Sequence, residues 1–159
     1  MIVIPGLTGD LNIPVMKVLV ATEKPFAAAA VKGIRDIIEG AGHELALLEK
    51  YTEKEQLLAA VADADALIVR SDKVTAEVIE AAKQLKVVVR AGAGYDNIDL
   101  KACTDRGIVA ENTPGQNSNA VAELAIAMML YMSRNQFNPG TGCELSGKTL
   151  GIQGFGNIG

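Results

Sequence analysis

Two arginines are the residues of this chain whose types and spacing best fit anion binding. Arg70 and Arg90 each follow a short apolar run, at 66–69 and 87–89. If these runs are strands of one parallel sheet, both guanidinium groups lie at its carboxyl edge, where open α/β sheets bind ligands. Planar guanidinium forks match the geometry of carboxylate and phosphate groups. The sequence therefore predicts a pocket for a small acid, which can be a phosphorylated one.

A bend at Gly92–Gly94 adds backbone donors to this pocket. Small residues directly after a parallel strand expose consecutive N–H groups, and glycine leaves the backbone free to take positive φ and lets other atoms come close. An ordinary turn between strand and helix, with two solvated strand-end charges, explains the same residues without a ligand.

The last six residues form a second candidate site. Gly154, Gly156 and Gly159 have the spacing G-x-G-x-x-G, directly after a predicted strand at 149–153. In the dinucleotide-binding fingerprint such glycines allow a tight turn and bring the backbone close to the pyrophosphate. The fingerprint also needs a following helix and an acidic residue ~20 residues further on, and the sequence supplies neither. We therefore expect half of a motif, which identifies a family but does not hold a cofactor by itself.

Other candidate groups fit structural roles. His43, the single histidine, begins a predicted strand and would lie at the amino edge of the sheet, opposite the ligand edge. Asp96 fits a turn, Asp99 fits a helix N-cap, and Cys103 fits core packing. The sequence shows no zinc-ligand spacing, nucleophile elbow or P-loop.

Composition excludes several classes of partner. The 159 residues carry a net charge of −4 without a basic block, which argues against nucleic-acid and membrane partners. Cys103 and Cys143 stand in no pairing motif, as expected in a reducing compartment. Residues 1–15 lack the basic start and continuous apolar stretch of a signal peptide, and no apolar run is long enough to span a bilayer. The sequence predicts a cytoplasmic protein.

Hydrophobic periodicity predicts the α/β fold that positions the arginines. Strand-like runs alternate with amphipathic helical segments five times, which is typical of a doubly wound parallel sheet. The expected strands lie at 17–21, 43–48, 66–69, 87–89 and 108–110, with a sixth at 149–153.

Helix signals set the expected boundaries of the intervening elements. Pro25 fits the first position of one helix. Thr52 with Glu55 three residues later fits a capping box, and Thr75 fits the N-cap of a third helix. A later helix, expected from Asn119 to Ser133, is apolar almost all round. Such a helix must be buried between layers or against another chain.

Five separated motifs resemble the D-isomer-specific 2-hydroxyacid dehydrogenase family, and within it the branch that oxidises 3-phosphoglycerate with NAD. These motifs are Val-Arg-Ser-Asp-Lys-Val-Thr at 69–75, Arg-Ala-Gly-Ala-Gly-Tyr-Asp-Asn-Ile-Asp at 90–99, Asn-Thr-Pro at 112–114, Asn-Ser-Asn-Ala-Val-Ala-Glu-Leu at 117–124, and Leu-Ser-Gly-Lys-Thr-Leu-Gly-Ile at 145–152.

The resemblance implies a domain plan and a set of site residues. Residues 16–115 would form a flavodoxin-like substrate-binding domain, 116–147 a crossover helix and linker, and 148–159 the first strand and glycine turn of a truncated NAD-binding Rossmann domain. Residues 1–15 have no counterpart. The implied substrate-binding residues are Arg70, Ser71, Arg90, Gly92, Ala93 and Gly94, and the implied cofactor-binding residues are Ala93, Gly154, Gly156, Asn157, Ile158 and Gly159.

The resemblance also implies an activity. The chain would be the amino-terminal part of an NAD-dependent oxidoreductase that converts 3-phosphoglycerate to 3-phosphohydroxypyruvate in serine biosynthesis. The family's catalytic arginine, glutamate and histidine lie beyond the fingerprint, so no catalytic residue is assigned and we expect this chain alone to be inactive. Loss of the nucleotide domain would expose the apolar helix 119–133, which predicts a homo-oligomer.

Three alternatives follow from the same residues. A non-catalytic, NAD-sensing co-repressor shares this architecture, and a peptide groove would distinguish it. A dehydrogenase for another 2-hydroxy acid, such as glyoxylate or hydroxypyruvate, is the second, although Arg70 together with Arg90 favours a doubly anionic substrate. A signalling receiver domain would need clustered acidic residues after the first strand, where the sequence offers Glu23.

Overall fold

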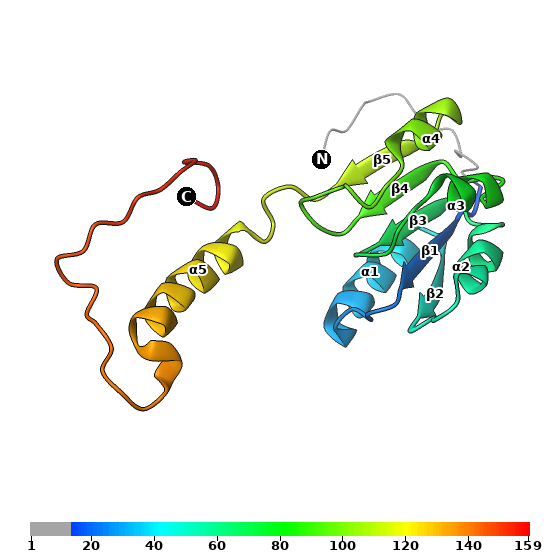
Figure 1. Cartoon of the computed structure of the whole chain (residues 1–159). Helices are drawn as coiled ribbons and strands as arrows, with labels where there is room; N and C mark the ends of the chain where they lie inside the picture. The colour runs from blue at the N-terminus through cyan, green and yellow to red at the C-terminus, as the bar shows by residue number, and fades with distance from the viewer. Residues whose placement is uncertain (1–13) are drawn as a thin grey trace, which may run out of the picture. The chain divides into compact units, whose positions relative to one another are not determined.

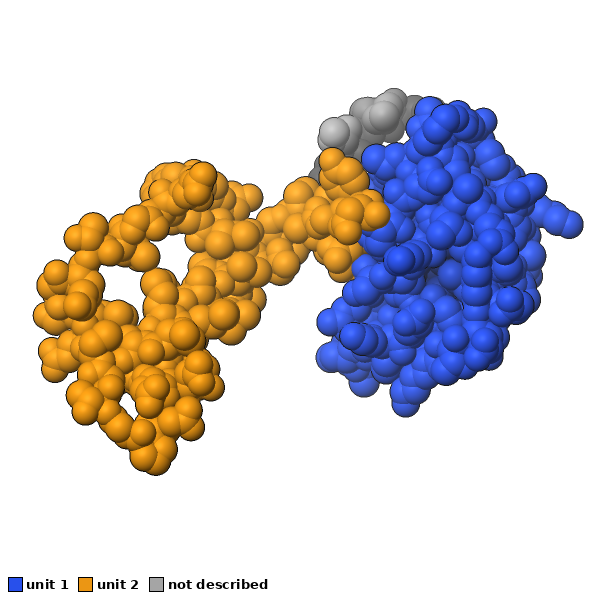
Figure 2. All heavy atoms as spheres, viewed as in Figure 1, with its two compact units in different colours: residues 1–89, 97–111 blue, residues 90–96, 112–159 orange. Residues whose placement is uncertain are grey.

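The computed structural model describes residues 14–159, which form two compact units. One unit runs to Val89 and includes Asn97–Glu111; the other comprises Arg90–Asp96 and Asn112–Gly159 (Figure 2). Residues 1–13 of the unmatched amino-terminal extension lie outside the described residues.

A five-stranded parallel sheet organises the first unit, as the sequence predicts. The strands are β1 (Lys17–Thr22), β2 (Glu44–Glu49), β3 (Ala66–Val69), β4 (Val87–Arg90) and β5 (Val109–Asn112). Their order is β2-β1-β3-β4-β5, and their arrows point the same way (Figure 1). In β1, Val18 is in register with Leu45 of β2 and with Ala66 of β3. This is the flavodoxin-like order of a doubly wound sheet.

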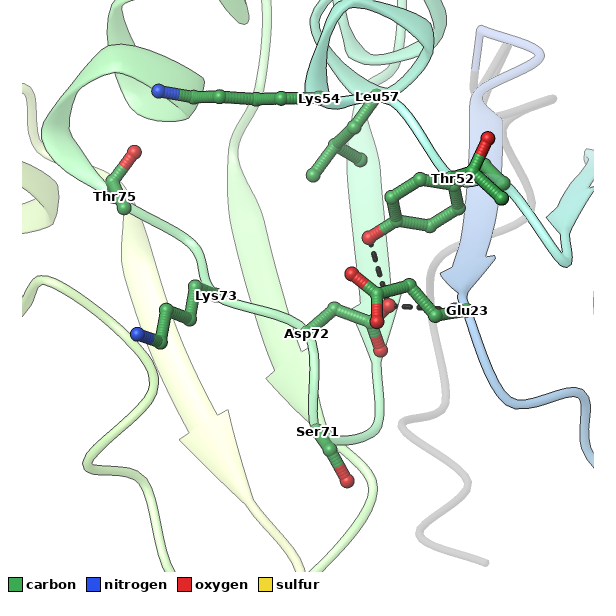
Figure 3. Close-up of a pocket in the computed structure, with 9 residues that line it drawn as sticks. Glu23, Thr52, Lys54, Leu57, Ser71, Asp72, Lys73 and Thr75 are labelled. Carbon is green, nitrogen blue, oxygen red and sulfur yellow. Dashed lines mark hydrogen bonds between the residues drawn. The ribbon is translucent and has the colours of Figure 1, made fainter.

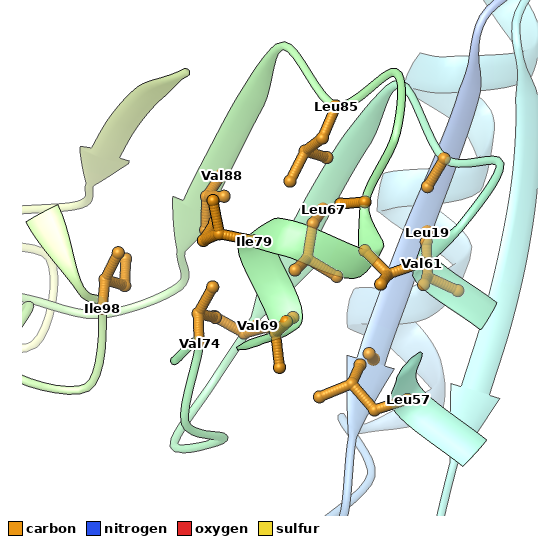
Figure 4. Close-up of a cluster of buried hydrophobic side chains, with 14 of the residues drawn as sticks. Leu19, Leu57, Val61, Leu67, Val69, Val74, Ile79, Leu85, Val88 and Ile98 are labelled. Carbon is orange, nitrogen blue, oxygen red and sulfur yellow. The ribbon is translucent and has the colours of Figure 1, made fainter. Parts of the chain in front are cut away.

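The hydrophobic core lies between one face of this sheet and the helices α2 (Lys54–Val61), α3 (Ala76–Ala81) and α4 (Leu100–Asp105). Because side chains alternate along a strand, β1 and β3 each send every second residue into this core. The core includes Leu19, Leu57, Val61, Leu67, Val69, Ile79 and Val88 (Figure 4). Val78 and Cys103 belong to the same core. The predicted packing role of Cys103 is thus confirmed, with 1% of the residue exposed.

Helix α1 (Ala28–Gly40) lies on the other face of the sheet (Figures 1 and 4). It begins three residues after Pro25, so the predicted start was wrong. None of its residues is fully buried, and Ile37 is 74% exposed. The residues packed against α2 and α3 therefore supply most of the buried apolar surface of this unit.

The capping of two helices differs from the prediction. The capping box of α2 is one residue later than expected: Oε1 of Gln56 accepts hydrogen bonds from the N–H groups of Thr52 and Glu53, at 3.0 and 3.1 Å. Thr75 is the N-cap of α3, but its buried hydroxyl has no hydrogen-bond partner among the described residues. Asp99 caps α4 as predicted, accepting from the Ala102 N–H at 2.9 Å.

The second unit contains the apolar helix α5 (Ser118–Ser133) and a short 3-10 turn, η1 (Asn135–Phe137). The predicted helix is confirmed, but within the described residues only Ser118 of α5 is buried. The predicted strand at 149–153 is wrong, because these residues are irregular. A strand needs a neighbouring strand for its backbone hydrogen bonds. Among the described residues, no strand is formed after β5. Among residues 14–159, no helix is long and apolar enough to cross a bilayer.

Candidate anion site

The two predicted arginines stand at the ends of neighbouring strands. Arg70 is the first residue after β3, and Arg90 is the last residue of β4. Arg70 is exposed, and its Cζ atom lies 6.0 Å from the centre of the Phe26 ring, within cation–π range. Ser71 is also exposed at this edge. The strand order thus places the two arginines at the ends of adjacent strands.

The glycine bend is shaped by the side chain of Arg90. A Cβ atom at Gly92 would overlap the Arg90 guanidinium, so a larger residue there requires this flexible side chain to move. Neither Gly92 nor Gly94 takes the positive φ that the sequence allows. The N–H of Gly92 donates to the carbonyl of Arg90 at 2.8 Å, and the remaining candidate donors are the amides of Ala93 and Gly94.

The bend is anchored by Asn112, the last residue of β5, and by Thr113, which follows it. The Asn112 side chain donates through Nδ2 to the carbonyl of Ala93 at 2.7 Å. The N–H of Thr113 donates to the carbonyl of Gly92 at 2.9 Å. In the sequence, the Asn112–Pro114 segment is one of the motifs that resemble the family, but its support of a bend almost 20 residues earlier leaves no local pattern.

A pocket of ≈ 440 Å³ opens beside Ser71 in the first unit (Figure 3). Its lining comes from the loops after β1, β2 and β3 and from the start of α2. The lining residues are Glu23, Tyr51, Thr52, Lys54, Leu57, Ser71, Asp72, Lys73 and Thr75. Of the predicted substrate-binding residues, Ser71 lines this pocket.

The buried polar centre of this pocket is the pair Tyr51 and Asp72. The Tyr51 hydroxyl donates to Oδ1 of Asp72 at 2.7 Å, and the N–H of Glu23 donates to the same oxygen at 2.7 Å. Burial raises the pKa of Tyr51 above its ordinary value, and the hydrogen bond to the Asp72 carboxylate raises it further. Sequence reasoning missed both residues. Both residues lie shortly after the end of a strand, and this position was the only hint in the sequence that they belong to a site. That they pair could not be predicted, because the hydrogen bond joins two different loops.

The residues of the glycine fingerprint lie in the second unit. Gly154 has φ +87°, and a Cβ at Gly159 would meet the carbonyl of Gly154 and the Cα of Phe155. A Cβ at Gly115 would come within 3.2 Å of the Asn157 side chain. The fingerprint also borders an apolar pocket of ≈ 600 Å³, lined by one side of α5 and by 150–154, Ile158 and Gly159.

His43, for which the sequence predicts a structural role, accepts a backbone hydrogen bond. Nδ1 of His43 accepts a hydrogen bond from the Met16 N–H at 3.3 Å, directly before the amino ends of β1 and β2. Residues 14–159 contain no cluster of three or more His, Cys, Asp or Glu side chains that could hold a metal ion.

Comparisons with known proteins agree with this arrangement. The family model for the D-isomer specific 2-hydroxyacid dehydrogenase catalytic domain matches residues 18–153. Hydroxypyruvate reductase of Thermotoga maritima is 44% identical over 130 residues, covering 73% of this chain and 42% of that protein. D-3-phosphoglycerate dehydrogenase of Sus scrofa is 45% identical over 141 residues, covering 79% of this chain and 26% of that protein.

A solved structure extends the likeness to three dimensions. NAD⁺-bound 3-phosphoglycerate dehydrogenase of Entamoeba histolytica superposes with a TM-score of 0.86 and 56% identity, covering 91% of this chain and 48% of that one. The chain thus spans less than half the length of these relatives. With the family model matching most of its residues, the chain belongs to the D-isomer-specific 2-hydroxyacid dehydrogenases.

Proposed function

We propose that this chain carries the acid-binding half of an NAD-dependent dehydrogenase whose substrate is 3-phosphoglycerate. The observation that carries the proposal is the placement of Arg70 and Arg90 at the ends of the neighbouring strands β3 and β4. A substrate with both a carboxylate and a phosphate offers two anionic groups, one for each guanidinium. The likeness to 3-phosphoglycerate dehydrogenases supports this choice of substrate.

The chain's own residues would bind and orient this acid. Arg70 supplies a permanent charge, and the Ser71 hydroxyl can donate a hydrogen bond to the same group. The amides of Ala93 and Gly94 would be the backbone donors beside Arg90. Groups that hold an acid in one orientation accelerate its reaction by positioning.

The glycine turn fits part of an NAD site. Positive φ at Gly154 and the close approach at Gly159 are the properties for which the fingerprint requires glycine. Gly154, Gly156 and Asn157 would face the pyrophosphate, and Ala93 and Ile158 would be further contacts. When bound, NAD accepts the hydride that leaves the 2-hydroxy acid.

We further propose that residues 1–159 alone do not oxidise the substrate. Oxidation of an alcohol needs a base near the hydroxyl, and histidine is the usual one. His43 instead lies at the amino end of β2 and accepts a hydrogen bond from the Met16 N–H. Mixing the chain with NAD and 3-phosphoglycerate should yield no NADH absorbance. A sustained rise in that absorbance would contradict this part of the proposal.

Binding of 3-phosphoglycerate, followed by titration calorimetry, tests the acid site directly. Arg70→Gln removes one guanidinium and should weaken binding by about tenfold or more, since charge-assisted hydrogen bonds contribute ~1.5–3 kcal/mol. Arg35→Gln is the matched control, because Arg35 forms an ion pair with Glu39 on the exposed face of α1. Equal affinities of the two variants would refute the role of Arg70. A parallel titration with NAD measures the other half-site separately.

A dehydrogenase for a non-phosphorylated 2-hydroxy acid is the second candidate, favoured by the 44% identity to hydroxypyruvate reductase. Comparing 3-phosphoglycerate with glycerate distinguishes the two. If the phosphate is recognised by an arginine, glycerate should bind about tenfold more weakly or worse. Equal binding of both acids favours the second candidate.

A further inference from the structure

The carboxylate of Asp72 joins three loops at the carboxyl edge of the sheet. Asp72 lies in the loop after β3 and is 6% exposed. Its Oδ1 atom accepts from the Tyr51 hydroxyl in the loop after β2 and from the Glu23 N–H in the loop after β1 (Figure 3). Because a buried carboxylate is unfavourable unless its oxygens accept hydrogen bonds, these two donors are what allow Asp72 to occupy this place.

The same loop is held on its other side by the backbone around Asn97. The Asn97 side chain donates through Nδ2 to the carbonyl of Asp72 at 2.8 Å. The Val74 N–H donates to the carbonyl of Asn97 at 2.8 Å, and the Asp99 N–H donates to the carbonyl of Val74 at 2.9 Å. Residues 72–74 are therefore anchored on two sides, directly after the exposed pair Arg70 and Ser71.

The orientation of the Asp72 carboxylate also fits a role in supporting the anion site without contacting the anion. A carboxylate beside an anion site would repel the anion if it faced the same way. The Asp72 carboxylate is instead turned towards Tyr51 and the Glu23 backbone, whereas the Ser71 side chain points away from it (Figure 3). The pKa of a tyrosine already lies above the physiological range, and burial and the Asp72 carboxylate raise that of Tyr51 further, so its hydroxyl stays a donor.

We propose that Tyr51 and Asp72 are positioning residues of the anion site, and that their hydrogen bond holds Arg70 and Ser71 in the conformation that binds the acid group of the substrate. The inference rests on the proposed function of Arg70. It adds two residues that the resemblance to known dehydrogenases does not supply, and their proposed role acts through Arg70 and Ser71.

Tyr51→Phe tests this inference because it removes the hydroxyl and keeps the packed ring. The matched control is Ile108→Val, which removes one methylene from the core just before β5 and costs a similar stability, ~0.5–1.5 kcal/mol. Both variants are titrated with 3-phosphoglycerate at a temperature where each is fully folded. Hydrogen exchange of the amides at 70–73 is followed by NMR in the absence of ligand.

Tyr51→Phe should weaken binding roughly three- to tenfold, the value of one hydrogen bond, and should speed exchange at 70–73. Ile108→Val should change neither. Asp72→Asn keeps one carbonyl acceptor and should lie between wild type and Tyr51→Phe. Wild-type affinity and exchange in Tyr51→Phe would overturn this inference while leaving the acid site intact. No binding by the wild-type chain would overturn the proposed function and this inference together.

Discussion

At the scale of single residues, Gly92 leaves the room that the Arg90 guanidinium occupies in the anion site. A Cβ at this position overlaps the Arg90 guanidinium, which is the far end of a flexible side chain. Gly92→Ala should therefore displace that guanidinium without unfolding the chain. We expect the free energy of unfolding to change by less than about 1 kcal/mol and the affinity for 3-phosphoglycerate to fall several-fold. Urea denaturation and calorimetric titration measure the two effects.

The control for this substitution is Gly33→Ala. Gly33 lies inside α1, and a Cβ there meets nothing within 4 Å. Because glycine in a helix interior costs conformational entropy, Gly33→Ala should stabilise the chain by about 0.5–1 kcal/mol and leave the affinity unchanged. If Gly92→Ala binds as tightly as Gly33→Ala, the position of the Arg90 side chain has no part in binding.

At the scale of elements, Asp65 joins strands at the amino edge of the sheet, opposite the anion site. Its carboxylate accepts from the Lys17 N–H of β1 at 2.9 Å and from Nζ of Lys86, just before β4, at 2.8 Å. The hydrogen bond from Lys86, followed by that from the Lys17 backbone, lowers the pKa of Asp65. The charged form is thus bound more favourably in the folded state than in the unfolded one.

The lowered pKa predicts a pH dependence with a definite sign. The stability from Asp65 is present above the unfolded pKa of ~3.9 and is lost as the pH falls through the lower folded pKa. Asp65→Asn should therefore cost about 1–2 kcal/mol at pH 7, and this difference should shrink below about pH 4, when measured by urea denaturation. Asp63→Asn, which removes an exposed ion pair with Lys17, should shift the midpoint little. A difference for Asp65→Asn that does not change with pH would show that its charge is not the cause.

Which elements were predictable depends on the range of the interactions that form them. Runs such as 66–69 and 87–89 carry their own strand signal, and Asp99 caps its helix with a local bond, so the sheet and the arginine positions follow from the sequence. The strand at 149–153 has the same local signal but lacks a neighbouring strand within the described residues, and it does not form. The Tyr51–Asp72 bond and the Asn112–Ala93 anchor join distant loops, which no local pattern encodes.

At the scale of the whole molecule, the exposed apolar face of α5 still needs an explanation. Leu124, Met128 and Tyr131 have helical i, i+4, i+7 spacing and share one face, and they are 58%, 56% and 41% exposed. Exposed apolar groups that line up along a helix are the usual mark of a surface that binds another chain. The relatives that this chain matches are longer, since the matches cover 42%, 26% and 48% of their lengths. A second copy of this chain is the partner we propose for this face.

Self-association through α5 predicts a concentration-dependent sedimentation coefficient. The double variant Leu124→Glu, Met128→Glu places two charges on the apolar face while keeping good helix formers, so it should sediment as a monomer where wild type associates. Ile37→Glu is the matched control, because Ile37 is 74% exposed on α1. It should associate like wild type, since the proposed contact lies on α5 and not on exposed apolar residues in general. A wild-type chain that remains a compact monomer at high concentration would exclude α5 as an interface, and equal loss of association in both variants would assign it to non-specific hydrophobic contact.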